Sequence, residues 1–335
     1  MSCNVAIVGA TGAVGAEFLI QLEQRRFPFT SLKLLASDRS AGKKLRCAGK
    51  EYTVEALRPD SFKGVNIALF SASTAIAKEY APIARDAGAV VIDNSSAFRL
   101  ESDVPLVVPE INPDAARRHK GIIANPNCTT IVALMAVGPL HKVSKITRLI
   151  ISSYQAISGA GAEAMAELEQ QTRDWVAGRP LKVETQPQQI LFNLYPHIDV
   201  FTDNGYTKEE MKLTFEGRKI LDHPTLKAAA TCVRVPVMRC HSVSINVEFE
   251  RKIAPDEARS ILGKSSGVEV FDNPAKAEYP TPLRYTQKEK VGVGRIREDI
   301  SSDRGGLALW SVGDQLAKGA AQNAVQIAEL LIKRR

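Results

Sequence analysis

The chain has 335 residues, of which 44% are hydrophobic and 24% charged, and its formal net charge is +7 at pH 7. This length accommodates two domains with separate cores, and the composition is that of an ordinary globular protein. No apolar run approaches the roughly 18 residues of a membrane span. Basic and acidic residues are interspersed, without the basic stripe and aromatic residues of a nucleic-acid surface. We therefore expect neither a membrane nor a nucleic acid as a partner.

Two further features of the sequence concern its compartment. The five cysteines are an odd number and lack CxxC spacing. This pattern argues against a disulfide framework and a structural zinc site, and we expect no bound metal. The N-terminus enters an apolar strand without the basic segment that begins a secretory signal, so we expect a cytoplasmic protein.

The first third of the chain alternates strands with helices. Helical spacing of apolar residues predicts one helix over 14–24 and another over 74–87 that stops at Gly88. Continuous apolar runs predict strands at residues 4–10, 31–37, 66–72 and 89–95. Such a βαβ rhythm predicts a parallel sheet with helices on both faces.

A glycine-rich turn joins the first predicted strand to the first helix. Gly9, Gly12 and Gly15 have GxxGxxG spacing, a variant of the dinucleotide fingerprint. Glycines allow a tight turn and a close approach of the backbone to a pyrophosphate, which would sit at the helix N-terminus. We therefore predict a dinucleotide site; the alternative is a turn that is glycine-rich for packing reasons alone.

The end of the second strand bears on which dinucleotide binds. NAD-dependent enzymes usually place an acidic residue there for the ribose 2′-hydroxyl, and NADP-dependent enzymes an arginine. Here the strand is followed by Asp38, Arg39 and Ser40. Arg39 and Ser40 favour NADP, whereas Asp38 leaves NAD open if its carboxylate points into the site.

Cys128 follows a second turn between a strand and a helix. Residues 122–124 are predicted as a buried strand, 125–127 as a turn, and 129 onward as an apolar helix. The thiol then lies on the first turn of a helix, where unpaired N–H groups and the helix dipole favour a thiolate at neutral pH. The sequence predicts a nucleophilic cysteine, with an inert buried thiol as the alternative.

The rest of the chain is predicted to form a second domain with long strands. A helix is expected over 162–177, and one terminal helix over 313–335 that packs back on the first domain. Strands are expected at residues 146–158, 226–237, 241–250, 291–299 and 305–312. Long strands joined by excursions indicate an α+β domain with a mixed or antiparallel sheet. The predicted fold class is thus α/β, with a Rossmann-like dinucleotide-binding domain (1–127 and 313–335) and an α+β domain (128–312).

A nucleophilic thiol needs a partner for proton transfer, and the sequence offers five histidines. His241 is the strongest candidate, because it begins a well-defined strand and strand ends are good positions for catalytic side chains. The alternative is a structural histidine in the core.

Several charged residues occur where anions could bind. Arg99 lies at the carboxyl edge of the fourth strand, where ligands of open α/β sheets bind. Arg234 interrupts an apolar strand, so it either faces water at an edge or binds an anion. Lys212 and Glu209 share one helix face at i and i+3, although such pairs are usually solvated surface ion pairs.

Taken in order, these strings resemble the aspartate-semialdehyde dehydrogenase family over the whole chain. They are GATGAVG at the start, DNSSAFR through Arg99, NPNCTT around Cys128, SYQAISGAG, EEMKL, and RVPVMRCHSVSIN from Arg234 to His241. No single string is decisive, but the ordered set is specific. The resemblance implies an NADP-binding first domain and a catalytic and dimerisation second domain, in a homodimer or a homotetramer.

The resemblance also implies a role for each matching residue. Cys128 corresponds to the acyl-enzyme nucleophile, His241 to the acid/base, and Gln155 to the residue that orients the substrate. Arg234 corresponds to the partner of the substrate α-carboxylate, and Glu209 to that of its α-ammonium.

The remaining implied contacts are to phosphate and to the cofactor. The phosphate ligands are Arg99 and Lys212. The cofactor contacts are Thr11, Gly12, Ala13, Val14, Arg39, Ser40, Ser158, Gly159 and Gln315. The sequence leaves open whether Glu209 or Glu210 faces the substrate ammonium.

These roles imply NADPH-dependent reductive dephosphorylation of L-4-aspartyl phosphate to L-aspartate 4-semialdehyde through a Cys128 thioester, and the reverse phosphate-dependent oxidation. Such an enzyme serves the biosynthesis of diaminopimelate, lysine, methionine, threonine and isoleucine. Its partners would be the small-molecule substrate and inorganic phosphate. The alternatives are a related acyl-phosphate reductase, such as N-acetyl-gamma-glutamyl-phosphate reductase, which needs no partner for a free ammonium, and a catalytically silent relative.

Overall fold

The computed structural model describes residues 3–332, which form two compact units. The first unit takes in the chain up to Asn127 and again from Gly319 onward, and the second unit is Cys128–Lys318. The chain leaves the first unit directly before Cys128. It returns at Gly319 rather than at Gly313, where the sequence analysis placed the boundary.

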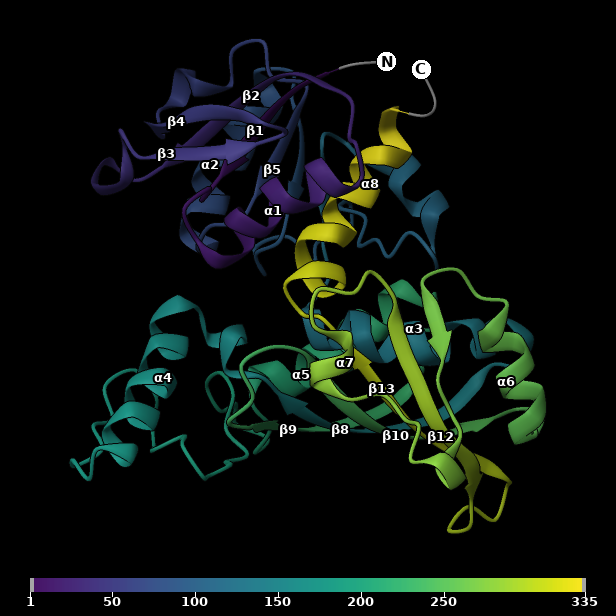
Figure 1. Ribbon diagram of the computed structural model, residues 1–335. Coiled ribbons are helices and arrows are strands. Elements are labelled where there is room, and N and C mark those ends of the chain that lie inside the picture. Colours follow the sequence, from purple (N-terminus) through teal and green to yellow (C-terminus); the bar gives the residue numbers. More distant parts are fainter. Residues whose placement is uncertain (1–2, 333–335) are drawn as a thin grey trace. The chain divides into compact units, whose positions relative to one another are not determined.

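A seven-stranded sheet forms the centre of the first unit, in the order β3-β4-β2-β1-β5-β6-β7 (Figure 1). The strands are β1 (Cys3–Val8), β2 (Phe29–Ala36), β3 (Lys44–Cys47), β4 (Lys50–Ala56), β5 (Ile67–Phe70), β6 (Val90–Asp93) and β7 (Ile122–Ala124). Neighbouring strands pair in parallel, except that β3 and β4 form an antiparallel hairpin at one edge. The predicted Rossmann-like sheet is confirmed; the hairpin was missed because its strands are short and largely polar.

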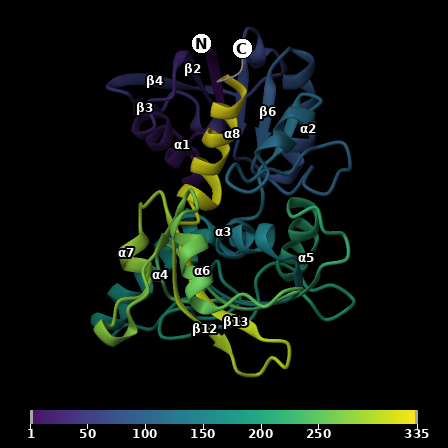
Figure 2. The ribbon, with the colours of Figure 1, turned by 90° about the vertical axis from the view of Figure 1, so that its right-hand side faces the viewer.

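Helices from both ends of the chain cover one face of this sheet. The helices of the unit are α1 (Ala13–Gln24), α2 (Thr74–Asp86) and α8 (Gln322–Ile332). Ile7 on β1, Phe18 on α1 and Ile327 on α8 belong to one buried apolar cluster. α8 lies beside α1 in both views (Figures 1 and 2), and Nε of Arg25 donates to Glu329 at 2.7 Å between them. The last helix is therefore part of the core of the first unit.

A six-stranded mixed sheet forms the centre of the second unit, in the order β11-β12-β13-β10-β8-β9. The strands are β8 (Ile146–Gln155), β9 (Lys227–Arg234), β10 (His241–Phe249), β11 (Val268–Val270), β12 (Val291–Asp299) and β13 (Gly306–Gly313). The pairs β11–β12 and β8–β9 are parallel, and the pairs β12–β13, β13–β10 and β10–β8 are antiparallel. The expected α+β unit with a mixed sheet is confirmed.

Three helices pack on one face of this second sheet, with α3 between α5 and α6 (Figure 1). The helices of the unit are α3 (Cys128–Val143), α4 (Ala162–Val176), α5 (Lys208–Ile220), α6 (Pro255–Gly263) and α7 (Pro282–Tyr285). Oγ of Ser311 on β13 donates to the carbonyl of Val132 on α3 at 3.1 Å, so Ser311 lies on the covered face. Although α3 is almost entirely buried, no helix within residues 3–332 has the length and apolarity to cross a membrane.

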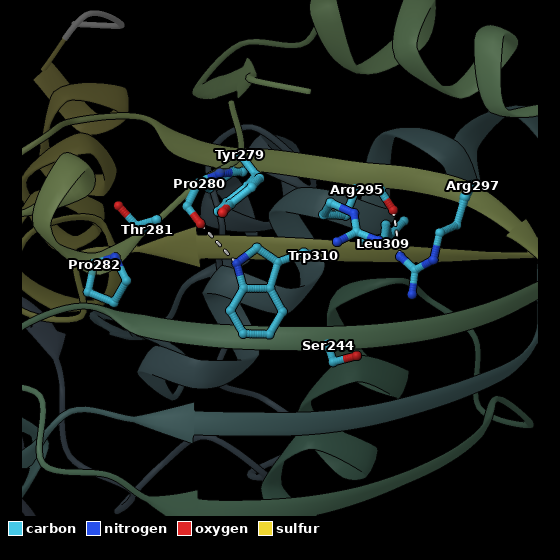
Figure 3. A pocket seen from close by; sticks show the side chains of 9 residues that line it. All are labelled: Ser244, Tyr279, Pro280, Thr281, Pro282, Arg295, Arg297, Leu309 and Trp310. Carbon is cyan, nitrogen blue, oxygen red and sulfur yellow. Dashed lines mark hydrogen bonds between the residues drawn. The ribbon is translucent and has the colours of Figure 1, made fainter. Parts of the chain in front are cut away.

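The opposite face of the second sheet carries a pocket of about 290 Å³ (Figure 3). Trp310 directly precedes Ser311 on β13 and lines this pocket, because successive residues of a strand alternate between the two faces of a sheet. Its indole Nε1 donates to the carbonyl of Pro280 at 3.0 Å. The other lining residues are Ser244, Tyr279, Thr281, Pro282, Arg295, Arg297 and Leu309. None of the site residues named from the sequence lines this pocket.

The predicted single helix over 313–335 is wrong at its start. β13 continues to Gly313, and the carboxylate of Asp314 accepts the backbone N–H groups of Leu316 and Ala317 at 3.0 and 3.1 Å. A π-helical turn, Ala317–Ala321, then leads into α8. Asp314 thus begins the helical segment later than the apolar periodicity indicated. The last predicted helical residues, 333–335, lie outside the described residues.

The packing of α1 on its own turn gives a stability prediction. A Cβ on Gly15 would lie 2.2 Å from the carbonyl oxygen of Gly9, which is backbone and cannot rotate away. We expect Gly15→Ala to lower the unfolding free energy by roughly 1–3 kcal/mol through this overpacking. The measurement is the unfolding midpoint by differential scanning calorimetry.

The matched control is Gly263→Ala, in α6. A Cβ there meets no atom within 4 Å, so this variant should be neutral or stabilised by up to about 1 kcal/mol. Equal losses in the two variants would contradict the steric explanation.

Candidate active site

The glycine turn of the first unit has the form of a dinucleotide cradle. Gly9 has a φ of +83°, and a Cβ there would lie 2.1 Å from the carbonyl oxygen of Ser71. A Cβ on Gly12 would lie 3.4 Å from its nearest neighbour, and Gly12 is the N-cap residue of α1, without a side-chain cap. The turn from Thr11 to Val14, exposed at Thr11 and Gly12 and half-buried beyond, therefore offers uncapped N–H groups and room for a backbone-bound pyrophosphate. These residues fit the phosphates of a dinucleotide.

In the segment after β2, the carboxylate of Asp38 is directed at Arg58. Both oxygens of its carboxylate accept from the guanidinium of Arg58, which follows β4. This ion pair holds the pKa of the Asp38 carboxyl below its usual range. Arg39 is exposed, and Oγ1 of Thr11 donates to Oγ of Ser40 at 3.3 Å, which joins this segment to the glycine turn. Arg58 could not be found from the sequence, because the pairing joins the ends of two strands that are neighbours only in the sheet.

Arg99 is held at the carboxyl ends of β6 and β7, as its sequence position indicated. Its Nε donates to the carbonyl of Asn125 at 2.9 Å, and its Nη2 to that of Asn94 at 2.6 Å. The amide of Asn125 donates to Oδ1 of Asn94, and the amide of Asn323 donates to Oδ1 of Asn125, both at 2.7 Å. A row of amides, buried at Asn125 and Asn323 and half-buried at Asn94, thus supports the loops whose carbonyl groups hold Arg99.

The second unit brings Cys128 and His241 into contact. Cys128 is the first residue of α3 and is partly exposed, and its Sγ lies 3.3 Å from Nε2 of His241. Nδ1 of His241 accepts the backbone N–H of Ala156 at 3.1 Å, so the neutral ring carries its proton on Nε2, facing the sulfur. Complete burial, and then the charge of Arg234, lower the pKa of His241 well below its ordinary value. His241 therefore meets the thiol as a neutral N–H donor.

The register of the sheet places Gln155 and Arg234 on the same face as His241. Gln155 pairs with Arg234 across β8 and β9, and both side chains are buried. Nη1 of Arg234 donates to the carbonyl of Ala156 at 2.8 Å. A Cβ on Gly159 would lie 3.1 Å from Cε1 of His241 and 3.2 Å from Nη1 of Arg234. The absence of a side chain at Gly159 thus keeps the approach to these two groups open.

Glu209 rather than Glu210 belongs to this cluster. Oε1 of Glu209 accepts from the amide of Gln155 at 3.3 Å, and Oε2 accepts from Nζ of Lys212 at 3.0 Å. Glu210 instead accepts the N–H groups of Thr207 at 2.7 Å and Cys232 at 3.0 Å, and so holds the start of α5 against β9. The geometry therefore separates two neighbouring carboxylates that the sequence could not distinguish.

Lys212 lies between two carboxylates. Besides Glu209, Nζ donates to Asp199 at 2.8 Å. Burial alone would lower the pKa of Lys212, but the two carboxylates outweigh it and the pKa is raised. The side chain of Lys212 is 24% exposed and that of Glu209 is 7% exposed, so this is not a solvated surface ion pair. Asp199 was missed, because it lies in an irregular segment without a recognisable pattern.

Gln315 forms hydrogen bonds that hold the segment before His241. Its Oε1 accepts the backbone N–H of Cys240 at 2.7 Å, and its Nε2 donates to Oγ of Ser158. Cys240 has a φ of +77°, a left-handed conformation that is uncommon for a residue with a Cβ. The neighbouring ion pair between Arg239 and the fully buried Asp314, at 2.6 Å, holds the same segment. No sequence motif indicated this pair.

The predicted site residues thus divide between the two units. In the second unit, Cys128 contacts His241, and Gln155 contacts Glu209, which contacts Lys212. His241 and Arg234 both bond the backbone of Ala156, the residue after Gln155, and Gly159 lies beside them. Ser158 and Gln315 bond each other in the same unit. The first unit holds Thr11, Gly12, Ala13, Val14, Arg39 and Ser40 around the glycine turn, and Arg99 at the ends of β6 and β7.

The thiols should differ sharply in reactivity. Cys128 is partly exposed, whereas the other four cysteines are buried, and burial raises the pKa of Cys47 to about 11 and that of Cys240 to about 12. We expect limiting iodoacetamide at neutral pH to modify Cys128 first, as read by peptide mass spectrometry. His241→Leu removes the N–H donor and should slow this reaction by about tenfold, since each pKa unit changes the thiolate fraction tenfold.

His141→Leu is the matched control for that variant, because His141 lies at the far end of α3 from Cys128. It should leave the alkylation rate unchanged. Rapid modification of a buried cysteine, or no effect of His241→Leu, would contradict the assigned geometry.

Two family models match the chain, one within each structural unit. "Semialdehyde dehydrogenase, NAD binding domain" matches residues 4–119, and "Semialdehyde dehydrogenase, dimerisation domain" matches residues 137–318. The aspartate-semialdehyde dehydrogenase of Aquifex aeolicus (strain VF5) is 53% identical over 99% of each chain.

Solved structures agree with this match. The crystal structure of aspartate semialdehyde dehydrogenase II from Vibrio cholerae, complexed with ASA, superposes with a TM-score of 0.97 at 46% identity, over 100% of this chain and 99% of that one. The aspartate semialdehyde dehydrogenase of Candida albicans, solved with NADP, gives a TM-score of 0.78 at 25% identity over 99% of each chain. The chain therefore belongs to the aspartate-semialdehyde dehydrogenase family.

Proposed function

We propose that this chain is an NADP-dependent aspartate-semialdehyde dehydrogenase. It would convert L-4-aspartyl phosphate to L-aspartate 4-semialdehyde and inorganic phosphate, and carry out the reverse oxidation. The observation that carries the proposal is the 3.3 Å contact between Sγ of Cys128 and Nε2 of His241, beside oppositely charged buried groups suited to an amino acid. The names of the full-length relatives support the same activity.

The first chemical step would use the thiol of Cys128. As a thiolate, Sγ attacks the acyl carbon, a C–S bond forms, and the bond from that carbon to the phosphate oxygen breaks. The N-terminal turn of α3 favours the negative sulfur, and Nε2–H of His241 stabilises it by a hydrogen bond. Phosphate leaves with the electron pair, and an aspartyl thioester remains on Cys128.

The second step would release the aldehyde. Bound NADPH would supply hydride to the thioester carbon. The resulting tetrahedral oxyanion collapses, the C–S bond breaks, and Cys128 leaves again as a thiolate that Nε2–H of His241 stabilises. Because Ala156 occupies Nδ1, any proton that His241 gives or takes at the reacting carbon passes through Nε2. The proton that the overall reaction consumes ends on the released phosphate.

Recognition of the substrate would rest on its two charged α-groups. Arg234 pairs with the α-carboxylate, and the buried carboxylate of Glu209 pairs with the α-ammonium. Gln155, which already donates to Glu209, orients the acyl group. An N-acetylated substrate has no free ammonium, so the position of Glu209 favours aspartyl over N-acetylglutamyl compounds. Arg99 and Lys212 are the proposed ligands of phosphate.

The cofactor would be NADP. The turn from Thr11 to Val14 would hold the pyrophosphate, and Arg39 and Ser40 the 2′-phosphate. Ser158, Gly159 and Gln315 would lie near the nicotinamide. The NADP in the Candida albicans structure supports this choice.

The proposal extends to assembly and location. The family model for residues 137–318 describes a dimerisation domain, which supports a homodimer or a homotetramer built through the second unit. All five cysteines are free thiols, which suits a reducing cytoplasm. The first unit would then serve as the NADP-binding domain, and the second as the catalytic and dimerisation domain.

The decisive assay is phosphate-dependent reduction of NADP by aspartate semialdehyde, followed at the absorbance of NADPH. Cys128→Ser should lower this activity by at least about a thousandfold, because the hydroxyl is a far poorer nucleophile. The same assay is repeated with NAD in place of NADP, and with N-acetylglutamate semialdehyde in place of aspartate semialdehyde. A near-normal rate for Cys128→Ser would refute the thioester route, and a higher rate with the N-acetylated aldehyde would refute the substrate.

The two adjacent glutamates allow a paired test of substrate recognition. Glu209→Gln should raise the KM for aspartate semialdehyde by about tenfold or more, because a charged partner of the ammonium is lost. Glu210→Gln should leave KM nearly unchanged but lower the unfolding free energy by roughly 1–2 kcal/mol, since it disturbs the cap of α5 and the N–H of Cys232. The opposite pattern would assign the ammonium to Glu210.

A further inference from the structure

The segment after β2 contains a conflict of charge. In dinucleotide-binding folds the residue at the end of this strand faces the adenosine ribose, where a carboxylate accepts from a 2′-hydroxyl and repels a 2′-phosphate. Asp38 is such a carboxylate, and it directly precedes the exposed Arg39. An uncompensated Asp38 would therefore oppose the binding of NADP that Arg39 and Ser40 favour.

Arg58 resolves this conflict through a two-pronged ion pair. Its Nη1 donates to Oδ2 of Asp38 at 3.3 Å, and its Nη2 donates to Oδ1. Both carboxylate oxygens are thus directed at the guanidinium, in the geometry that makes arginine–carboxylate pairs specific. The pair carries no net charge, which leaves Arg39 as the uncompensated charge of the segment from Asp38 to Ser40.

The backbone fixes Arg58 at this place. β4 is the parallel neighbour of β2, with Ala56 in register with Ala36, and the N–H of Leu57 continues the ladder to the carbonyl of Ala36 at 2.8 Å. Nη1 of Arg58 also donates to the carbonyl of Leu57 at 3.1 Å, and its backbone N–H donates to Oγ of Ser61 at 3.0 Å. The guanidinium therefore approaches Asp38 from the neighbouring strand in a supported conformation.

We propose that Arg58 determines the cofactor preference of this enzyme: by neutralising Asp38 and holding its carboxylate, it admits a 2′-phosphate and so favours NADP over NAD. The inference rests on the proposed function, because it presupposes that the glycine turn binds a nicotinamide dinucleotide. Arg58 acts through Asp38, which makes it a positioning residue rather than a direct ligand.

The test is a double-mutant cycle on the full chain, with dissociation constants for NADP and NAD measured by isothermal titration calorimetry without substrate. Arg58→Gln leaves the Asp38 carboxylate unpaired, so the ratio of the NAD to the NADP dissociation constant should fall by roughly tenfold. Asp38→Asn should preserve the preference for NADP. Arg58→Gln combined with Asp38→Asn should restore NADP affinity, because no carboxylate remains to be neutralised.

Two results would overturn the proposal. If NADP affinity falls equally in Arg58→Gln and in the double variant, Arg58 contacts the 2′-phosphate directly. If the ratio does not change in Arg58→Gln, the pair has no part in specificity. Both side chains are largely exposed, 54% for Arg58 and 74% for Asp38, so the variants should keep the wild-type unfolding midpoint.

The ionic-strength dependence gives an independent readout. Repulsion between the freed carboxylate and the 2′-phosphate is screened by salt, so the loss of NADP affinity in Arg58→Gln should shrink at high salt. A loss that does not depend on salt would count against the inference.

Failure of the proposed function is distinguishable from failure of this inference. A wild-type chain that binds neither dinucleotide refutes both, whereas one that binds NADP, with an unchanged ratio in Arg58→Gln, refutes only the inference.

Discussion

The hydrogen bond from the Ala156 backbone to Nδ1 of His241 constrains the chemistry of the whole second unit. It orients the imidazole ring, assigns the proton of the neutral ring to Nε2, and thereby presents a donor to Sγ of Cys128. Ala156 is itself held at the end of β8, where its carbonyl accepts from Arg234 on the neighbouring strand. The protonation state of the Cys128 thiol therefore depends on how β8, β9 and β10 pair, and not on the cysteine and histidine alone.

The buried charges around this pair are arranged so that each has partners. Arg234 and Glu209 are both nearly inaccessible to water, and unpaired charges in such positions would destabilise the fold. Glu209 accepts from Gln155 and Lys212, and Lys212 is shared with Asp199. These charges are held in place before binding, so they would need little rearrangement to receive the zwitterionic substrate that we propose.

Much of the fold and of the site could be predicted, because the signals are local. The spacing of Gly9, Gly12 and Gly15 directly after an apolar strand indicated the dinucleotide turn, and the strand–turn–helix order placed Cys128 at a helix start. The terminal helix was misplaced at its beginning, since the cap made by Asp314 breaks a periodicity that looks continuous in the sequence. The β3–β4 hairpin was missed because edge strands with polar residues lack a strong pattern.

By itself, the sequence determined the local structure that most of the proposed site residues occupy and indicated which of them could carry the chemistry, because both depend on neighbours a few positions away. Only the tertiary structure decided which way the side chains point and what they meet. Glu209 and Glu210 are adjacent, yet successive residues of a helix point about 100° apart, and so one enters the site while the other caps α5. Asp38 meets Arg58 because β2 and β4 are neighbours in the sheet, a pairing that arises from packing and leaves no pattern in the chain.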